Sequence, residues 1–533
     1  MLKRSNSPTN KHASIASFTT SWRHFSRSLL LLVLLLGVLA GTFMQPARAA
    51  SSETKVLPQL QNEAEANPDK DFRVIVSRVE GTTSADDKLK ELGGTKVKDI
   101  PDEAFVAMVK GKKLAELSKD ASVKYVTLDS PMRGTGTVDA SKLATLYPQV
   151  ARAAGLWSGS TPLTGAGIGV AVLDTGIQSA SSDWKDASGN SRIAAQVLFN
   201  SNTKSMNDAH GHGTHVAGII AGNSWQVTDT AIKGKYVGIA PEAKLINVKV
   251  SDDAGMSYIS DVVTAIDWVI NNRKTYNIRV MNLSLVSGTA ESYTTSILDA
   301  AVERAWFNGI FVVVAAGNTG KDTVMYPPAN DPFVMTVGAA DPMGTVAQGD
   351  DTIAPWSSYG TTQDGFSKPE AVAPGRYMVS TLASGGSTLA KQFPDRIVDT
   401  NYLRLSGTSM AAPVVAGVAA LAYQAHPEWT NDQVKWLLMN TATKLGTTTT
   451  TTDATTGTTT TTFTAHPGQG AGEIDAAKVA TYSSAPGYAN QGLTISPLLT
   501  TTDGTTTYTA DTTASWSTAS WSTASWSTSS SFE

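Results

Sequence analysis

The sequence predicts an α/β fold, in which helices cover both faces of a mostly parallel β-sheet, preceded by a small α+β module. Continuous apolar runs recur along the central part of the chain, as expected for strands buried on both faces. Segments with apolar residues at helical spacing lie between these runs. Nearer the N-terminus, shorter segments alternate charged and apolar residues. Repeated βαβ units form a parallel sheet, so we expect the functional site at the carboxyl ends of the strands.

The composition limits the possible classes of protein. The chain has 533 residues, a formal net charge of -4 and no cysteine. This length leaves room for about three domains. The small negative charge provides no field that attracts nucleic acid, so we expect no nucleic-acid partner. The absence of cysteine excludes disulfides, thiolate metal sites and a cysteine nucleophile.

Residues 1–49 have the parts of a secretory signal peptide. Basic residues precede an apolar run over 29–44, and an A-x-A cleavage site ends at Ala49. The run is about 16 residues long, shorter than the roughly 20 that span a membrane as a helix. We therefore expect a cleaved signal rather than a membrane anchor, and a secreted, extracellular product.

Residues 50–133 are expected to form an N-terminal segment whose folded part is 71–133. Its pattern of strand, helix, strand, strand, helix and strand has the split βαβ order of ferredoxin-like modules. Residues 134–146 have mixed polarity and are interpreted as a linker. The expected elements are 72–76, 84–92, 97–100, 104–109, 112–119 and 123–128.

Residues 147–482 carry the βαβ pattern. The expected strands are 168–173, 244–250, 280–285 and 310–316, and the helices between them include 259–270 and 296–307.

Two segments of low complexity follow. Residues 447–464 are nearly all threonine and are interpreted as a solvated insertion. Residues 483–533 are rich in serine and threonine and end in an ASWST repeat that contains Trp516, Trp521 and Trp526. This tail is predicted to be disordered or a simple surface repeat. The alternative is that its evenly spaced indoles contact a cell surface.

Residues 405–421 join a Gly-Thr-Ser turn to a long uncharged segment, which predicts a helix buried on all sides. Pro413 is expected in the first turn of this helix, where its missing N–H costs nothing. Ser409 would lie at the helix N-terminus, beside free N–H groups and the positive end of the dipole. That position suits a nucleophile, although the simplest interpretation of Ser409 alone is a helix cap.

Other polar residues are ambiguous when taken singly. His210, His212 and His215 fall close together, and one of them is a general base, a zinc ligand or a structural residue. Asp174 and Asn318 each follow a predicted buried strand, where turn residues are common. Together, a serine, an imidazole base, a carboxylate to orient it and an amide donor make up the parts of acyl-transfer chemistry.

Three motifs in this order resemble the signatures of the subtilisin-like (subtilase) serine peptidases. They are Asp174-Thr175-Gly176, His212-Gly213-Thr214-His215-Val216-Ala217-Gly218 and Gly407-Thr408-Ser409-Met410-Ala411-Ala412-Pro413. The resemblance covers about 147–482. It implies that Asp174 orients the base His212 and that Ser409 attacks the scissile carbonyl. It further implies that Asn318 and the Ser409 N–H form the oxyanion hole, and that His215 is structural. By the same resemblance, 71–133 is an inhibitory pro-segment removed by self-cleavage within 134–146.

The resemblance also indicates substrate contacts. Residues 280–285 match the family's edge strand that pairs with substrate. Val286 stands where the family usually has glycine, and Met325 stands where the pocket floor is commonly small. We therefore hypothesise a P1 pocket smaller than one that accepts large aromatic side chains. The expected substrate-binding residues are Ser284, Leu285, Val286, Gly317 and Met325.

The chemistry implied by the resemblance requires no cofactor, but many subtilases bind structural calcium. The corresponding loop, 223–230, has Asp229 as its only charged residue, and Asp183 is a further candidate ligand. The alternatives are an ordinary surface loop and calcium at another site.

The resulting expectation is a secreted, monomeric serine endopeptidase made as a self-processing zymogen, with broad action on proteins and peptides. One alternative is a processing peptidase of narrow specificity. Another is an inert surface-binding protein on a peptidase fold, against which the presence of Asp174, His212, Ser409 and Asn318 argues.

Overall fold

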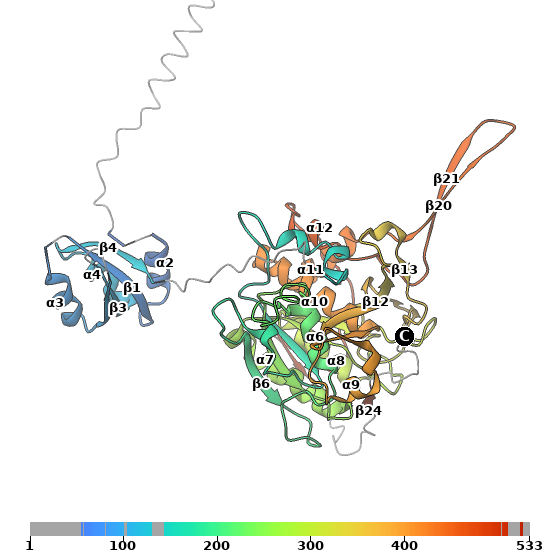
Figure 1. Cartoon of the computed structure of the whole chain (residues 1–533), viewed down its shortest axis with the longest axis horizontal. Coiled ribbons are helices and arrows are strands. Elements are labelled where there is room, and N and C mark those ends of the chain that lie inside the picture. Colours follow the sequence, from blue (N-terminus) through green and yellow to red (C-terminus); the bar gives the residue numbers. More distant parts are fainter. Residues whose placement is uncertain are drawn as a thin grey trace, which may run out of the picture. The chain divides into compact units, whose positions relative to one another are not determined.

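The computed structural model describes residues 55–56, 58–79, 81–100, 104–129, 143–502, 504–509 and 523–525, the last three by their backbone alone. The predicted signal peptide, most of the predicted linker and all three repeat tryptophans lie outside these residues. The chain divides into two compact units, Met1–Met132 and Arg133–Glu533 (Figure 1).

The first unit is a four-stranded antiparallel sheet with two helices in the predicted split βαβ order. The strands are arranged β2-β3-β1-β4, and alternate residues of β1 are buried in the unit's own core. The elements are β1 (Asp71–Arg78), α3 (Ser84–Glu91), β2 (Thr95–Ile100), β3 (Ala104–Lys110), α4 (Gly111–Leu117) and β4 (Val123–Leu128).

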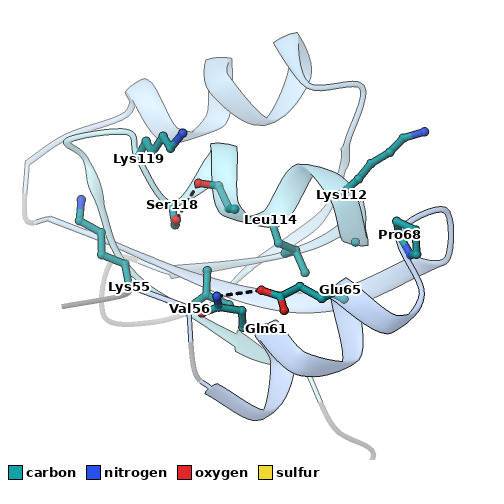
Figure 2. Close-up of a pocket in the computed structure, with 12 residues that line it drawn as sticks. Lys55, Val56, Gln61, Glu65, Pro68, Lys112, Leu114, Ser118 and Lys119 are labelled. Atoms are coloured by element: carbon teal, nitrogen blue, oxygen red, sulfur yellow. Dashed lines mark hydrogen bonds between the residues drawn. The ribbon is translucent and has the colours of Figure 1, made fainter. Parts of the chain in front are cut away.

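A further helix, α2 (Pro58–Ala66), was not expected from the sequence, which is mostly polar there. Leu60 and Ala64 lie one turn apart and are buried in the core of the unit. A pocket of about 550 Å³ lies along α2 and α4 (Figure 2). The folded part of this unit therefore begins well before residue 71.

The second unit is built on a mostly parallel sheet with the strand order β13-β12-β11-β9-β5-β7-β6, and β16 also pairs with β12. Only β13 runs antiparallel to its neighbour in this sheet, and β5 and β11 are buried along their whole length. The strands are β5 (Gly169–Asp174), β6 (Ile193–Leu198), β7 (Lys244–Lys249), β9 (Ile278–Leu283), β11 (Phe311–Ala315), β12 (Met335–Asp341), β13 (Thr352–Ile353) and β16 (Ala371–Pro374).

Helices cover the sheet as predicted. Helix α6 (His212–Ala221) packs against α10 (Thr408–Ala425), and α7 (Ile259–Tyr276) packs against α8 (Ile297–Phe307). Helix α11 (Asn431–Thr441) contacts β11. Helix α10 is long and apolar enough to cross a membrane, but 89% of it is buried inside the unit. It is therefore the central helix of the core.

The placement of Pro413 in the first turn of this helix was wrong. Helix α10 already begins at Thr408, so Pro413 lies inside it. A proline there cannot donate to the carbonyl four residues earlier, which is that of Ser409. The Ser284 hydroxyl donates to this carbonyl instead, at 3.0 Å.

The threonine-rich insertion is an exposed β-hairpin that projects from the unit (Figure 1). Its strands are β20 (Gly446–Thr452) and β21 (Thr459–Ala465), and every strand residue after Gly446 is exposed. β-Branched threonine favours extended backbone, so a solvated threonine run forms strands without a core.

The interpretation of all of 483–533 as a disordered tail or simple repeat was wrong for its first part. Residues 483–502 and 504–509 lie on the second unit and include a hairpin of β22 (Leu499–Thr502) and β23 (Thr505–Tyr508). Leu499 is buried, and the Ser496 N–H donates to Glu303 Oε2 at 2.8 Å. The folded unit thus extends past 482, because specific polar partners offset the scarcity of apolar residues.

Glu303, on α8, is fully buried beside another carboxyl. Burial raises the pKa of the Glu303 carboxyl above its ordinary value of 4.5, and the charge of nearby Asp331 raises it further. Burial also raises the pKa of Asp331, whose carboxyl lies near that of Glu303. The folded protein therefore holds a proton here that the unfolded chain releases.

This proton makes stability depend on pH. Because the pKa of Glu303 is higher in the folded state, its contribution is complete below 4.5 and is lost as the pH rises above that value. The variant Glu303→Gln has no proton to release. We expect it to be more stable than the parent at about pH 9, by at least about 1.4 kcal/mol, and similar at about pH 4.5. Thermal melting across pH measures this.

The matched control is Glu428→Gln, since the Glu428 side chain is 66% exposed. It should melt with the pH dependence of the parent. An equal pH dependence for Glu303→Gln and the parent would contradict the protonated carboxyl.

Candidate active site

Three neighbouring parallel strands bring the predicted site residues to one edge of the sheet. Leu173 of β5 pairs with Leu283 of β9, which in turn pairs with Val314 of β11. Asp174 directly follows Leu173, and Ser284 directly follows Leu283. Asn318 comes shortly after the end of β11. The carboxyl ends of these strands therefore supply residues from three separate parts of the chain.

Ser409 joins this edge from the first turn of α10. Its hydroxyl donates to the Ser284 carbonyl at 3.3 Å, while the Ser284 hydroxyl donates to the Ser409 carbonyl at 3.0 Å. Two bonds of opposite sense thus hold Ser409 beside the end of β9. Ser409 also lies at the positive end of the α10 dipole, which favours negative charge there.

Asp174 and His212 form a buried pair. The His212 Nδ1 lies 3.0 Å from Asp174 Oδ1 and 3.1 Å from Asp174 Oδ2. Burial raises the pKa of the Asp174 carboxyl, while the charge of His212 and the Thr175 N–H act in the opposite direction. A carboxylate facing Nδ1 fixes the tautomer with its proton on Nδ1, so Nε2 is the basic nitrogen.

Asp208 fixes the start of α6, and sequence reasoning gave it no role. Its Oδ1 accepts from the Gly211 N–H at 2.7 Å, and its Oδ2 accepts from the Thr214 N–H at 2.8 Å. The Thr175 hydroxyl also donates to Asp208 Oδ1 at 2.8 Å. Asp208 thereby ties the first turn of α6, and with it His212, to the residue after Asp174. An aspartate shortly before a helix start is the signal that would have identified it.

Asn318 is oriented by the start of α10. Its Oδ1 accepts from the Thr408 N–H at 2.9 Å and from the Thr408 hydroxyl at 3.0 Å. The amide group Nδ2 is on the side of Gly407, where an added Cβ would lie 3.5 Å from it. The oxygen is thus committed to Thr408, and the donor group lies at the turn that leads into Ser409.

The other two histidines of the cluster have different environments. His215 Nε2 lies 3.1 Å from the Met378 carbonyl and 2.8 Å from the Leu403 carbonyl, so it must carry the proton and donate. Burial lowers the pKa of His215 to about 3 and that of His210 to about 4. Among the described residues, no group of three or more His, Asp or Glu side chains is arranged to hold a metal ion.

The two candidate calcium ligands take part in the fold. The Asp183 carboxylate accepts from the Thr381 hydroxyl at 2.6 Å and from the Tyr402 hydroxyl at 3.2 Å. Asp229 accepts from the Ala231 N–H in its own loop. These contacts tie both carboxylates into the fold.

The expected substrate-binding residues lie on two adjoining segments. Ser284 and Leu285 lead directly into β10 (Val286–Ser287), where Val286 is half-buried. The Ser287 N–H donates to the Pro327 carbonyl at 2.7 Å, which places the segment after Met325 against β10. Gly317 has a φ of 101°, a left-handed conformation that suits glycine next to Asn318.

Comparisons with known proteins agree with this geometry. The model of the subtilase family matches residues 165–463, which include Asp174, His212, Asn318 and Ser409. The chain is 38% identical to the serine protease AprX of Bacillus subtilis over 339 residues, which are 62% of this chain and 71% of that protein. It is 38% identical to subtilisin Savinase of Lederbergia lenta over 286 residues, which are 54% of this chain and 87% of that protein.

Among solved structures, a cold-adapted subtilisin-like serine proteinase aligns with 53% of this chain and 84% of its own, with a TM-score of 0.40 and 29% identity.

The Asp208 contacts lead to a test of how the site is held. Asp208→Ala removes the acceptors of the Gly211 and Thr214 N–H groups, so the start of α6 should loosen. We expect peptide hydrolysis to fall about tenfold or more, because misplacing a catalytic group by about 1 Å costs up to about 10²-fold. Stability should fall by about 1 kcal/mol, as for other lost caps. Steady-state kinetics and thermal melting measure the two effects.

Asp186→Ala is the matched control, because Asp186 also accepts two backbone N–H groups but lies in an exposed loop. It should lose some stability and retain full activity. An unaltered kcat in Asp208→Ala would contradict a positioning role for Asp208.

Proposed function

Because the chain belongs to the subtilase family and is therefore a serine endopeptidase, we propose that Asp174, His212, Ser409 and Asn318 carry out its chemistry. The observation that carries this assignment is the Asp174–His212 pair at the same sheet edge where Ser284 holds Ser409. His212 Nε2 takes the Ser409 proton as the hydroxyl attacks the scissile carbonyl, and Asp174 stabilises the imidazolium. His212 then protonates the leaving amine, and water hydrolyses the acyl-enzyme by the same route in reverse.

The oxyanion formed by this attack needs donors that are already in place. Asn318 Nδ2 is one, since the bonds from Thr408 to the amide oxygen turn the NH2 group toward Gly407, in the turn that leads into Ser409. The Ser409 N–H is the second, because the first turn of a helix leaves N–H groups without partners inside the helix. Each such donor contributes about 3–4 kcal/mol to transition-state stabilisation.

The rest of the chain supports a secreted zymogen. The pattern of residues 1–49 is that of a signal peptide, and the first compact unit has a separate core, as an independently folding pro-segment requires. In this proposal the unit inhibits the enzyme until self-cleavage in the linker. The mature enzyme acts as a monomer on proteins and peptides with broad specificity.

The four residues can be tested with a serine-reactive fluorophosphonate probe. The secreted parent should be labelled on Ser409, and Ser409→Ala should not be labelled. A parent that takes no label, or equal labelling of Ser409→Ala, would overturn the proposed nucleophile.

Two variants of Asn318, compared by steady-state kinetics and thermal melting, distinguish oxyanion stabilisation from an effect on folding. Asn318→Asp keeps the oxygen that Thr408 contacts but replaces the amide donor, whereas Asn318→Ala removes both. Asn318→Asp should melt near the parent temperature, whereas Asn318→Ala should lose about 1 kcal/mol of stability because the Thr408 N–H loses its acceptor. Both variants should lose about 10²–10³-fold in kcat with little change in KM. A kcat near that of the parent would exclude Asn318 as an oxyanion donor.

Substrate preference follows from Val286 and Met325, which we propose narrow the P1 pocket. The parent should then favour small P1 side chains in a peptide library. Met325→Ala should raise kcat/KM for Phe or Tyr relative to Ala by at least about tenfold, since added pocket volume is worth about 1–3 kcal/mol per methylene.

Met343→Ala is the control for this test, because Met343 is a 56% exposed methionine. It should keep the parent preference. A parent that cleaves mainly after Phe or Tyr would rule out the narrow pocket.

A further inference from the structure

The C-terminal repeat contributes one described strand, β24 (Thr523–Ser525). It is the middle strand of an antiparallel three-stranded sheet, between β8 (Met256–Tyr258) and β10. Ser525 pairs with Val286 on one side and with Met256 on the other. A segment more than two hundred positions away in the sequence thus joins two short strands that do not pair with each other.

Each of these two strands follows a segment that ends at the catalytic edge of the sheet. Strand β10 begins two positions after Ser284, whose carbonyl accepts from the Ser409 hydroxyl. Strand β8 follows β7, whose last residue, Lys249, pairs with Asp174. Both strands therefore come from the carboxyl edge of the sheet where the catalytic residues lie.

We propose that the chain's own ASWST repeat lies as a substrate-like strand in the cleft between β8 and β10, where the expected substrate-binding residue Val286 is located. This rests on the proposed function, and it adds an internal competitor at the same site. Strand edges recognise an extended partner through backbone hydrogen bonds, a mode that tolerates many sequences.

The composition of the repeat fits the cleft. The residues of β24 are Thr, Ala and Ser, which are small and uncharged. The ASWST unit also contains one Trp, but no proline or glycine that would weaken a central strand. Val286, which is expected from the sequence to contribute to a small P1 pocket, stands opposite a serine in the register.

The repetition of the ASWST unit favours binding of the tail in the cleft between β8 and β10. Ala514, Ala519 and Ala524 begin three identical units, so a slip of one unit presents the same residues in the same register. A tethered segment acts at an effective concentration of about 1 mM. Substrate must displace the repeat, so the tail raises the apparent KM and leaves kcat unchanged.

The test compares three secreted forms, and the concentration of active enzyme in each is determined by fluorophosphonate titration of Ser409. They are the full chain, a chain that ends at Thr509, and a full-length chain with Ala514→Pro, Ala519→Pro and Ala524→Pro. Proline has no N–H to donate to a central strand. Both altered forms should have a KM for a short peptide about threefold or more below that of the full chain, with an equal kcat, as expected for removal of an internal competitor at millimolar effective concentration.

The matched control replaces the same three alanines with serine, which keeps every N–H group. It should retain the KM of the full chain. A synthetic peptide of residues 514–528 should inhibit the form that ends at Thr509 competitively, and its triple-proline version should not. This arm does not depend on whether secretion leaves the tail attached.

Equal KM values for the proline and serine forms, together with no inhibition by the peptide, would overturn the proposal. Normal titration of Ser409 in that case would leave the proposed function intact. Failure of titration would instead refute the proposed function itself.

Discussion

The hydroxyl of Ser284 donates to the carbonyl of Ser409, and the geometry of the site depends on this bond. Pro413 lies where a residue with an N–H would have closed the helical bond to that carbonyl. The carbonyl is buried in the core, where an unsatisfied acceptor costs about 1–3 kcal/mol. Ser284 satisfies it at 3.0 Å, and its own carbonyl accepts from the Ser409 hydroxyl. Pro413 leaves the Ser409 carbonyl without a helical partner, so this carbonyl accepts from Ser284 instead. The resulting bond ties the start of α10 to the end of β9.

The start of α6 is held by the same physical requirement. The first N–H groups of a buried helix need partners, and Asp208 supplies them for α6 while Asn318 supplies one for α10. Both caps come from segments at the carboxyl edge of the sheet. Satisfying the two helix ends thus also sets where His212 and Ser409 lie relative to Asp174. The same contacts therefore position the catalytic side chains and provide acceptors for the backbone N–H groups at the helix ends.

The difference between local sequence patterns and contacts with distant residues explains which features the sequence predicted. Buried parallel strands have a distinctive apolar composition, so Asp174 and Asn318 were placed at strand ends from the sequence, and the motifs identified His212 and Ser409. The position of Pro413 and the role of Asp208 depend on partners distant in the chain. Residues 483–509 were misjudged because composition does not reveal a buried carboxyl such as Glu303, which accepts from the Ser496 N–H. The pairing of β24 has no local signal either, since its partners lie on β8 and β10.

The shortness of these strands determines how the repeat acts. Strand β10 spans two residues and β24 spans three, so few backbone bonds hold the repeat. Each contributes only about 0.5–1.5 kcal/mol net, which gives weak docking that a substrate can displace. Longer edges would bind the repeat too tightly for turnover, and they would also invite pairing between molecules. In the absence of substrate the tethered repeat therefore occupies the cleft between β8 and β10, and a bound substrate displaces it. For this reason the tail should alter KM and leave kcat unchanged.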